Sequence, residues 1–291
     1  MQPVPLVHRG DDGHSALASF GSPFLLPNAR QLDVISKQGQ EYRILIDIPS
    51  HPAPATGFPV ICMVDGNALF PSAVAAARLQ RGRPEVTGVT PAILVGIGYP
   101  DDDVLFHDGR RRQDLLPDRG GADRFLDFIA HEAMPVIASI APVDCRRQSL
   151  VGHSLGGLFV LHALFTRSVL FRSYVAGSPS IWWNECEILS KEAAFRSKGP
   201  GAMDRHLLIA VGGEEQSPDP EDLSDRARRL RMARMLDNAS EMAERLTTSG
   251  HISCQYVVFD GENHISVVPA MLARALAFSL RDATAPEKGT P

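Results

Sequence analysis

A serine, a histidine and a pair of glutamates stand at positions along the chain where they could form a nucleophilic catalytic site. Ser154 lies in the sequence GHSLG, between an apolar strand-like run and an apolar helical run. In that context the pattern G-x-S-x-G indicates a nucleophile elbow, a sharp strand-to-helix turn that projects the serine at the edge of a sheet. Because a serine hydroxyl is a weak nucleophile, it needs a neighbouring base.

His264 is the strongest candidate for that base. It follows the last predicted strand, in the sequence FDGENHIS, where a protein with this order of elements places its catalytic histidine. His251 precedes the same strand and so lies at its other end, and His162 falls inside the helix that follows the elbow. We therefore predict that His264 removes the proton from Ser154.

A carboxylate is needed to hold the imidazole in one tautomer and to stabilise its positive charge. The order of such sites along the chain places this acid after the penultimate strand, here in HLLIAVGGEEQ. We predict Glu215 for this role. Glu214, Asp219 or Asp222, or a Ser–His dyad that works without an acid, remain alternatives.

Two main-chain N–H groups are expected to bind the oxygen that becomes negatively charged during acyl transfer. The residue after the nucleophile, Leu155, should supply one of them. Asn67, in the Asp-Gly-Asn turn after the third predicted strand, should supply the other. An ordinary turn with no catalytic role is the alternative for this second segment.

Arginines and tryptophans follow two other predicted strands. Arg110, Arg111 and Arg112 come after the fourth strand, and Trp182 and Trp183 come after the sixth. Arginine suits planar anionic oxygen donors, and tryptophan stacks on aromatic rings. We predict a substrate-binding role for all five, against the alternatives of surface ion pairs for the arginines and packing beneath a loop for the tryptophans.

The elements that must position these residues alternate between apolar strand-like runs and helical patterns. Residues 100–120 are polar and are expected to be irregular. Strands are predicted at residues 31–39, 41–50, 58–66, 91–100, 148–154, 172–178, 206–215 and 253–261, and helices at 68–80, 122–140, 155–166, 226–248 and 267–280.

Buried strands that alternate with helices predict an α/β fold with about eight strands, mostly parallel, and helices on both faces of the sheet. In such sheets ligands bind at the carboxyl ends of the strands. Residues 1–30 are expected to form an irregular arm, residues 31–282 a single catalytic domain, and residues 283–291 a disordered tail. The short stretch between GSPS and the next strand leaves no room for a large lid domain.

Composition narrows the function classes. The net charge of −5 argues against a general nucleic-acid binder. No apolar run approaches the ~18 residues of a membrane helix, and the N-terminus lacks a secretory pattern, so a cytoplasmic location is expected. The four cysteines form no CxxC pair, and VGIGYPD lacks the third glycine of a dinucleotide turn. We expect no nucleotide or other cofactor and no catalytic metal.

Several segments together resemble the enterobactin and salmochelin esterase family, which hydrolyses tris-catecholate siderophore lactones, and most of all its broad cytosolic branch. They are MVDGNALF, RRRQDLLP, GGADRFLDFI, GHSLGG, GSPSIWWNE, VGGEEQ and DGENHIS. The resemblance implies an α/β-hydrolase fold with Ser154 as nucleophile, His264 as base and Glu215 as acid, and Asn67 and Leu155 as oxyanion donors. The chain departs from the family pattern where DLLP replaces an aromatic-Thr-Pro ending.

These observations predict a serine esterase that works through an acyl-enzyme on a tris-catecholate lactone or another bulky ester. A general carboxylesterase for small acyl or aryl esters is the first alternative. A siderophore-binding protein that hydrolyses little is an alternative of another class. The expected partner is a small ester molecule, with neither nucleic acid nor membrane, and the oligomeric state stays open.

Overall fold

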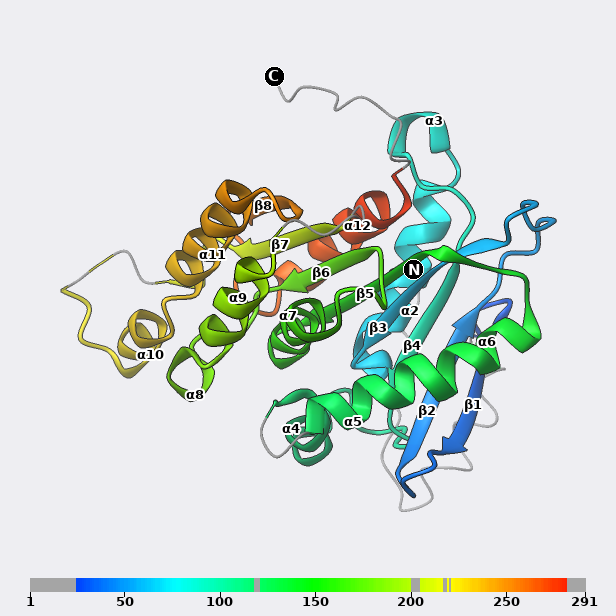
Figure 1. Ribbon diagram of the computed structural model, residues 1–291, viewed down its shortest axis with the longest axis horizontal. Helices are drawn as coiled ribbons and strands as arrows, with labels where there is room; N and C mark the ends of the chain where they lie inside the picture. Colours follow the sequence, from blue (N-terminus) through cyan, green and yellow to red (C-terminus); the bar gives the residue numbers. More distant parts are fainter. Residues whose placement is uncertain (1–24, 118–120, 200–204, 217–218, 220, 282–291) are drawn as a thin grey trace, which may run out of the picture.

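A computed structural model describes residues 25–117, 121–199, 205–216, 219 and 221–281, which pack around one eight-stranded sheet (Figure 1). The strand order is β1-β2-β4-β3-β5-β6-β7-β8. β1 pairs with β2 and β2 with β4 in antiparallel fashion, and every other pairing is parallel. The strands are β1 Ala29–Ile35, β2 Glu41–Asp47, β3 Phe58–Val64, β4 Ile93–Gly98, β5 Val143–His153, β6 Ser173–Gly177, β7 His206–Gly212 and β8 Ser253–Phe259.

Helices cover both faces of the sheet because the buried strands are apolar on both sides. On β3, Cys62 and Val64 belong to one core cluster, whereas Ile61 and Met63 belong to the other. Helices α2 (Gly66–Gln80) and α12 (Val267–Leu280) cover one face. The opposite face is covered by α5 (Gly121–Phe128), the π-turn η2 (Ile129–Ala133), α6 (Met134–Ile140), α7 (Leu155–Arg167), α9 (Ile188–Ser197) and α11 (Met235–Ser249).

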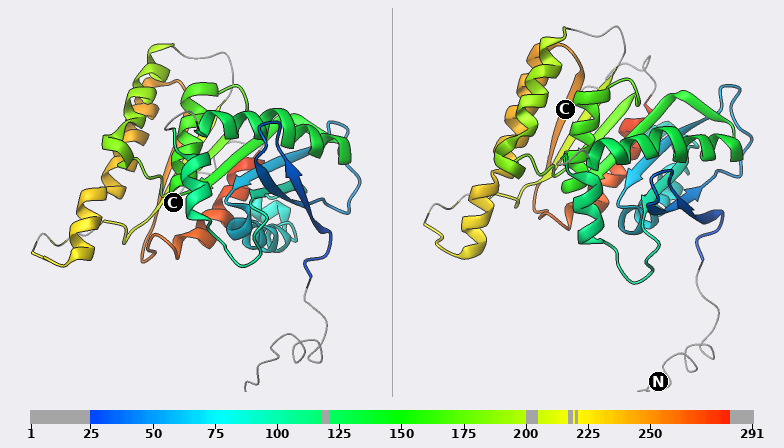
Figure 2. Two further views of the ribbon diagram at one scale, coloured as in Figure 1. Left: turned by 90° about the horizontal axis from the view of Figure 1, so that it is seen from below. Right: turned by 60° about the horizontal axis from the view of Figure 1, so that its bottom comes forward.

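Four short helices lie at the ends of strands or between longer helices. They are α3 (Pro84–Thr87), α4 (Asp108–Leu115), α8 (Trp183–Cys186) and α10 (Asp225–Ala233). Helix α10 projects beyond the rest of the molecule next to α11 (Figure 2). Only Ala227 of α10 is buried, so this helix is attached to the body by few side chains.

The predicted fold class is confirmed: the chain is an α/β protein with an eight-stranded, mostly parallel sheet and helices on both faces. The described part of the segment between β6 and β7 holds only α8 and α9. None of the helices in the described ranges is long and apolar enough to cross a membrane. The division into arm, catalytic domain and tail stays a prediction, because residues 1–24 and 282–291 lie outside the described part of the chain.

Two expectations about the elements were wrong. Residues 100–120 include α4, whose sequence DGRRRQDL is almost entirely polar and so carries no apolar period that would reveal a helix. The helix expected over 226–248 is two helices, because Arg234 adopts a left-handed conformation (φ 44°, ψ 45°) between α10 and α11.

The packing of α2 on β4 gives a test of this arrangement. A Cβ added at Gly66 would lie 2.6 Å from the carbonyl carbon of Gly96 and 2.8 Å from the main-chain nitrogen of Ile97. Because strand backbone cannot move aside, we expect Gly66→Ala to lower the free energy of unfolding by about 2–3 kcal/mol in urea denaturation. Gly109→Ala is the control, since nothing lies within 4 Å of its added Cβ. The control should unfold at or above the wild-type urea concentration, and equal midpoints for the two variants would contradict this account.

Candidate active site

Ser154 occupies a strained turn between β5 and α7. Its backbone has φ 61° and ψ −117°, a conformation that non-glycine residues rarely adopt. The Ser154 N–H donates to the carbonyl oxygen of Gly177, and the Ser154 carbonyl accepts from the N–H of Ser180. A Cβ at Gly152 would lie 2.3 Å from the carbonyl oxygen of Gly156, so the turn needs glycine there. The predicted elbow is therefore present, held from both sides by main-chain hydrogen bonds.

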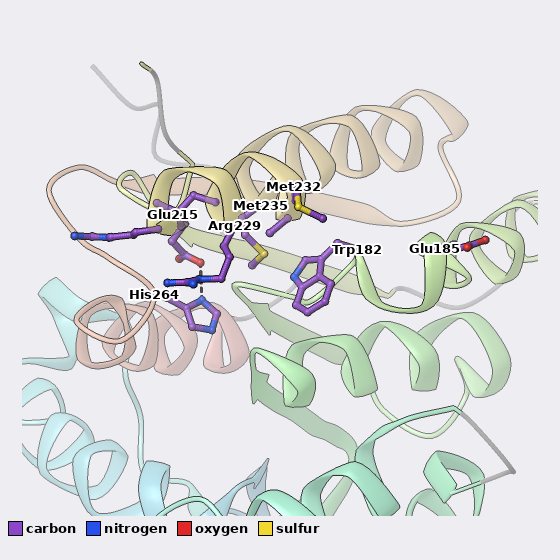
Figure 3. Close-up of a pocket in the computed structure, with 10 residues that line it drawn as sticks. Trp182, Glu185, Glu215, Arg229, Met232, Met235 and His264 are labelled. Carbon is purple, nitrogen blue, oxygen red and sulfur yellow. Dashed lines mark hydrogen bonds and ion pairs between the residues drawn. The ribbon is translucent and has the colours of Figure 1, made fainter. Parts of the chain in front are cut away.

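The structure brings the three predicted triad residues into one hydrogen-bonded chain. Ser154 Oγ lies 3.0 Å from Nε2 of His264, which stands in the loop after β8. Nδ1 of His264 lies 2.7 Å from Oε2 of Glu215, in the turn after β7 (Figure 3). This arrangement allows the imidazole to accept the serine proton on Nε2 while the carboxylate holds its other nitrogen.

Glu215 is buried, and every oxygen of its carboxylate is engaged. Oε1 accepts from Ser178 Oγ at 2.5 Å and from the Gly212 N–H at 2.7 Å. Burial by itself would raise the pKa of Glu215, but the hydrogen bonds from His264, Ser178 and Gly212 outweigh it and hold the pKa below its ordinary value. The group is thus a carboxylate at neutral pH. The alternatives Glu214, Asp219 and Asp222 are all exposed to solvent.

The two predicted oxyanion donors lie at the starts of helices. Leu155 is the first residue of α7 and Asn67 the second residue of α2, and main-chain N–H groups in a first turn have no partner within their own helix. A Cβ at Gly156 would lie 3.2 Å from Oδ2 of Asp65, so the turn that leads into α2 sits beside the elbow. Both N–H groups therefore belong to adjoining turns at the same edge of the sheet.

A cavity of about 640 Å³ opens beside the triad. Glu215 and His264 line it at one end, and α10 forms one of its walls. Figure 3 shows Arg229 extending from α10 toward His264, while Trp182 faces the cavity from the loop after β6. The full lining is Trp182, Glu185, Glu215, Arg226, Arg229, Leu230, Met232, Ala233, Met235 and His264. Its walls are thus mainly apolar, with two arginines among them.

Of the residues predicted to bind substrate, only Trp182 lines this cavity. Arg111 is buried, and its guanidinium donates to both oxygens of the Asp65 carboxylate. Arg110 packs over the ring of Tyr99. These positions follow from α4, a helix that the sequence pattern did not reveal, which turns its first arginines onto the protein body.

Arg112 and Trp183 contact each other outside the cavity. The Arg112 guanidinium lies 5.3 Å from the centre of the Trp183 ring, and Trp183 packs against the core on the α7 side of the sheet. This agrees with the alternative weighed for Trp183, packing beneath a loop. A role for Arg112 in binding stays a prediction.

Arg226 and Arg229 are the site residues that the sequence analysis missed. They lie on α10, which was expected to be the first part of one long helix over residues 226–248. A signal was present: the basic run DRARRLR follows the candidate acid Glu215, after the carboxyl end of a strand. In the structure this run forms α10, which ends at the left-handed Arg234.

His153, the variable residue of the elbow, packs against His264. The ring centres of His153 and His264 are 4.7 Å apart. Burial, together with the nearby His264, lowers the pKa of His153 to about 3. The ring behind His264 is therefore uncharged throughout the neutral range. Among the described residues, no group of three or more His, Cys, Asp or Glu side chains is placed to hold a metal ion.

Comparison with known proteins identifies the family. A family model described as "Putative esterase" matches residues 35–277. The ferri-bacillibactin esterase BesA of Bacillus subtilis (strain 168) is 39% identical over 262 residues, which cover 84% of this chain and 86% of that protein. The chain belongs to the siderophore esterase family. It is therefore a carboxylic ester hydrolase with the α/β-hydrolase fold.

Two further proteins resemble this esterase over most of its length. The siderophore triacetylfusarinine C esterase of Aspergillus fumigatus (strain ATCC MYA-4609 / CBS 101355 / FGSC A1100 / Af293) is 36% identical over 282 residues, covering 90% of the chain and 96% of the relative. The crystal structure of the BES protein from Bacillus cereus has a TM-score of 0.79 at 36% identity, covering 89% of this chain and 97% of that one. The family-model match, residues 35–277, spans the elbow, the β7 turn and the β8 loop of this esterase.

Separate substitutions of Glu214 and Glu215 test which of them is the carboxylate that supports His264. Glu215→Gln leaves a neutral amide against His264, which no longer stabilises the positive imidazole, so kcat for p-nitrophenyl butyrate should fall about 10³- to 10⁴-fold. Glu214→Gln changes an exposed residue and should keep kcat within about twofold of wild type. A larger loss in the Glu214 variant than in the Glu215 variant would reverse the assignment.

Proposed function

We propose that this esterase hydrolyses a bulky, anionic siderophore ester, of the tris-catecholate lactone type, through a Ser154–His264–Glu215 triad. The observation that carries the proposal is the hydrogen-bonded chain from Ser154 to Glu215, which opens onto a cavity bordered by Arg226, Arg229 and Trp182. The names of the relatives, which are esterases of bacillibactin and of triacetylfusarinine C, support the siderophore part.

In the first half-reaction, Ser154 Oγ attacks the ester carbonyl carbon and His264 Nε2 takes the serine proton. The carbonyl oxygen becomes an oxyanion, which the N–H groups of Leu155 and Asn67 stabilise. His264 then gives the proton to the leaving alkoxide, and the acyl group stays on Ser154. In the second half-reaction a water molecule loses a proton to His264 and attacks the carbonyl carbon of the acyl-enzyme. As the bond to Ser154 breaks, His264 returns that proton to Ser154 Oγ, which releases the acid and restores the free enzyme.

The cavity suits a substrate that is both aromatic and anionic. Trp182, 40% exposed, and Met232, 76% exposed, offer faces on which a ring can pack. Arg226 and Arg229 offer planar donors for anionic oxygens. A catecholate ring carries both properties in one group. The volume of about 640 Å³ lies in the range of pockets that take drug-sized ligands.

A general carboxylesterase for small acyl or aryl esters is the second candidate. The mainly apolar lining favours it, because Leu230, Ala233 and Met235 would accept a plain acyl chain as well as a substituted ring. The two candidates share the triad and differ only in what the cavity selects. Measured preference between substrates therefore separates them.

A paired rate assay tests the reaction and the substrate together. Wild type and Ser154→Ala each receive an iron-loaded and an iron-free tris-catecholate trilactone, and p-nitrophenyl butyrate. We expect wild type to open the lactone much faster than the simple ester, and the variant to lose at least about 10⁴-fold in kcat on both.

The other outcomes of this assay are equally informative. Cleavage of the simple ester alone would leave the general carboxylesterase. Tight binding of the lactone by wild type, without hydrolysis, would point to a binding protein. Equal rates for wild type and Ser154→Ala on both substrates would show that the triad is wrong.

The α10 arginines give a separate test of charge selection. Replacing Arg226 and Arg229 together by Gln should raise KM for the iron-loaded lactone about tenfold and leave KM for p-nitrophenyl butyrate unchanged, since only the anionic ligand loses ionic partners. Arg228→Gln is the matched control, because Arg228 is on the same helix, pairs with Asp225 and does not line the cavity. An equal rise in both KM values would count against selection by charge.

A further inference from the structure

A buried ion pair that the proposed mechanism does not use joins the turn between β3 and α2 to helix α4. The side chain of Asp65 is 1% exposed and that of Arg111 is 9% exposed. Arg111 Nε donates to Asp65 Oδ1 at 2.6 Å, and Nη2 donates to Oδ2 at 3.1 Å. Two parallel bonds of this kind fix the relative orientation of both groups.

This pair stands next to both expected oxyanion donors. Asp65 is two residues before Asn67 and adopts a left-handed conformation (φ 54°, ψ 42°), which sets the direction in which the chain enters α2. Its Oδ2 would lie 3.2 Å from a Cβ at Gly156, the residue after Leu155. The Asp65 carboxylate therefore touches the turns that carry the two N–H groups.

A second anchor holds Asn67 from the other side. Its side-chain oxygen accepts from the Tyr99 N–H at 2.9 Å, and its side-chain nitrogen donates to the carbonyl oxygens of Tyr99 and Asp101 at 3.0 and 2.9 Å. Two anchors thus fix the turn that carries the main-chain N–H of Asn67. The Asn67 side chain binds the loop after β4, and Asp65 binds Arg111 on α4.

The ion pair also offsets the negative charge of Asp65. A carboxylate beside an oxyanion site would repel the negative charge that develops on the substrate oxygen, and in a buried setting this repulsion is weakly screened. The guanidinium of Arg111 offsets that charge. Its influence reaches the elbow, since Arg111 is among the groups that, after burial and His264, lower the pKa of His153 to about 3.

We propose that Arg111 is a positioning residue for the oxyanion hole, which through Asp65 fixes the turn that carries Asn67 and neutralises a carboxylate beside the nucleophile. This inference rests on the proposed function, because it requires that Asn67 and Leu155 bind the oxyanion. It assigns Arg111 a role in the rate of the chemical step rather than in substrate binding.

The test separates transition-state stabilisation from ground-state binding. In Arg111→Gln we expect kcat for p-nitrophenyl butyrate to fall about 10- to 100-fold while KM stays within about threefold, because a misplaced donor acts mainly in the transition state. The inhibition constant of phenyl trifluoromethyl ketone, which adds to serine as a tetrahedral anion, should rise by the same factor as kcat/KM falls. Arg111→Lys keeps the positive charge but cannot donate two parallel hydrogen bonds to Asp65. Its kcat should lie between those of wild type and Arg111→Gln.

The double variant Asp65→Asn/Arg111→Gln separates the effect of an unpaired Asp65 charge from the effect of losing the hydrogen bonds that orient the turn. The double variant removes the carboxylate that Arg111→Gln leaves unpaired, so it should recover part of the lost kcat and much of the lost stability. A double variant no faster than Arg111→Gln would overturn the part of the proposal that concerns charge.

Arg245→Gln is the matched control for a general effect on folding. Arg245 also donates to both carboxylate oxygens of a buried residue, Glu192, whose side chain is 1% exposed and which binds Arg196 as well. This pair joins α11 to α9 and lines no part of the cavity. The control variant should lower the urea midpoint and leave kcat within about twofold.

If Arg111→Gln raises KM alone, or keeps wild-type kcat while Ser154→Ala is inactive, the proposal is overturned. If Ser154→Ala is as active as wild type, the triad fails instead.

Discussion

One chain of hydrogen bonds ties together the carboxyl ends of four neighbouring parallel strands, and the site depends on it. Ser154 follows β5, Ser178 follows β6, Glu215 follows β7 and His264 follows β8. Glu215 receives hydrogen bonds from both Ser178 and His264, and His264 contacts Ser154. Because parallel strands end at the same edge of a sheet, loops far apart in sequence meet there, and their polar groups can satisfy one another away from water.

The strands and the order of the triad residues could be predicted because their signals are local. FPVICMV, residues 58–64, is apolar throughout, as a strand covered on both faces must be, and the elbow needs glycine on both sides of Ser154. The position of His264 after the last strand follows from the same topology. The choice of Glu215 over Glu214 depended on one residue of register in a turn, and burial of Glu215 between Ser178 and Gly212 is visible only in three dimensions.

The arginines could not be assigned from sequence, because their surroundings determine what each one does. Arg111 and Arg229 both follow a strand at the same edge of the sheet. Helix α4 folds Arg111 onto a buried carboxylate, and its donors are used within the protein. Helix α10 is separated from α11 by the left-handed Arg234, and its arginines border the cavity. The polar sequence of α4 has no apolar periodicity that would predict a helix, and no change in the apolar pattern marks the end of α10 at Arg234.

The two parts of the site thus differ in how firmly they are attached to the core: the turns around Ser154 are anchored by many buried contacts, and the α10 wall by few. The elbow, the turn at Asp65 and the proposed triad are fixed by buried hydrogen bonds and an ion pair, which is the rigidity that the proposed acyl transfer needs. The α10 wall contributes Met232 and Arg229 to the cavity but buries only Ala227 in the body. Few buried apolar contacts mean low local stability. We therefore expect changes on this wall to alter what the cavity accepts without moving Ser154, His264 or Glu215. Relatives of this chain are named for esters of different siderophores.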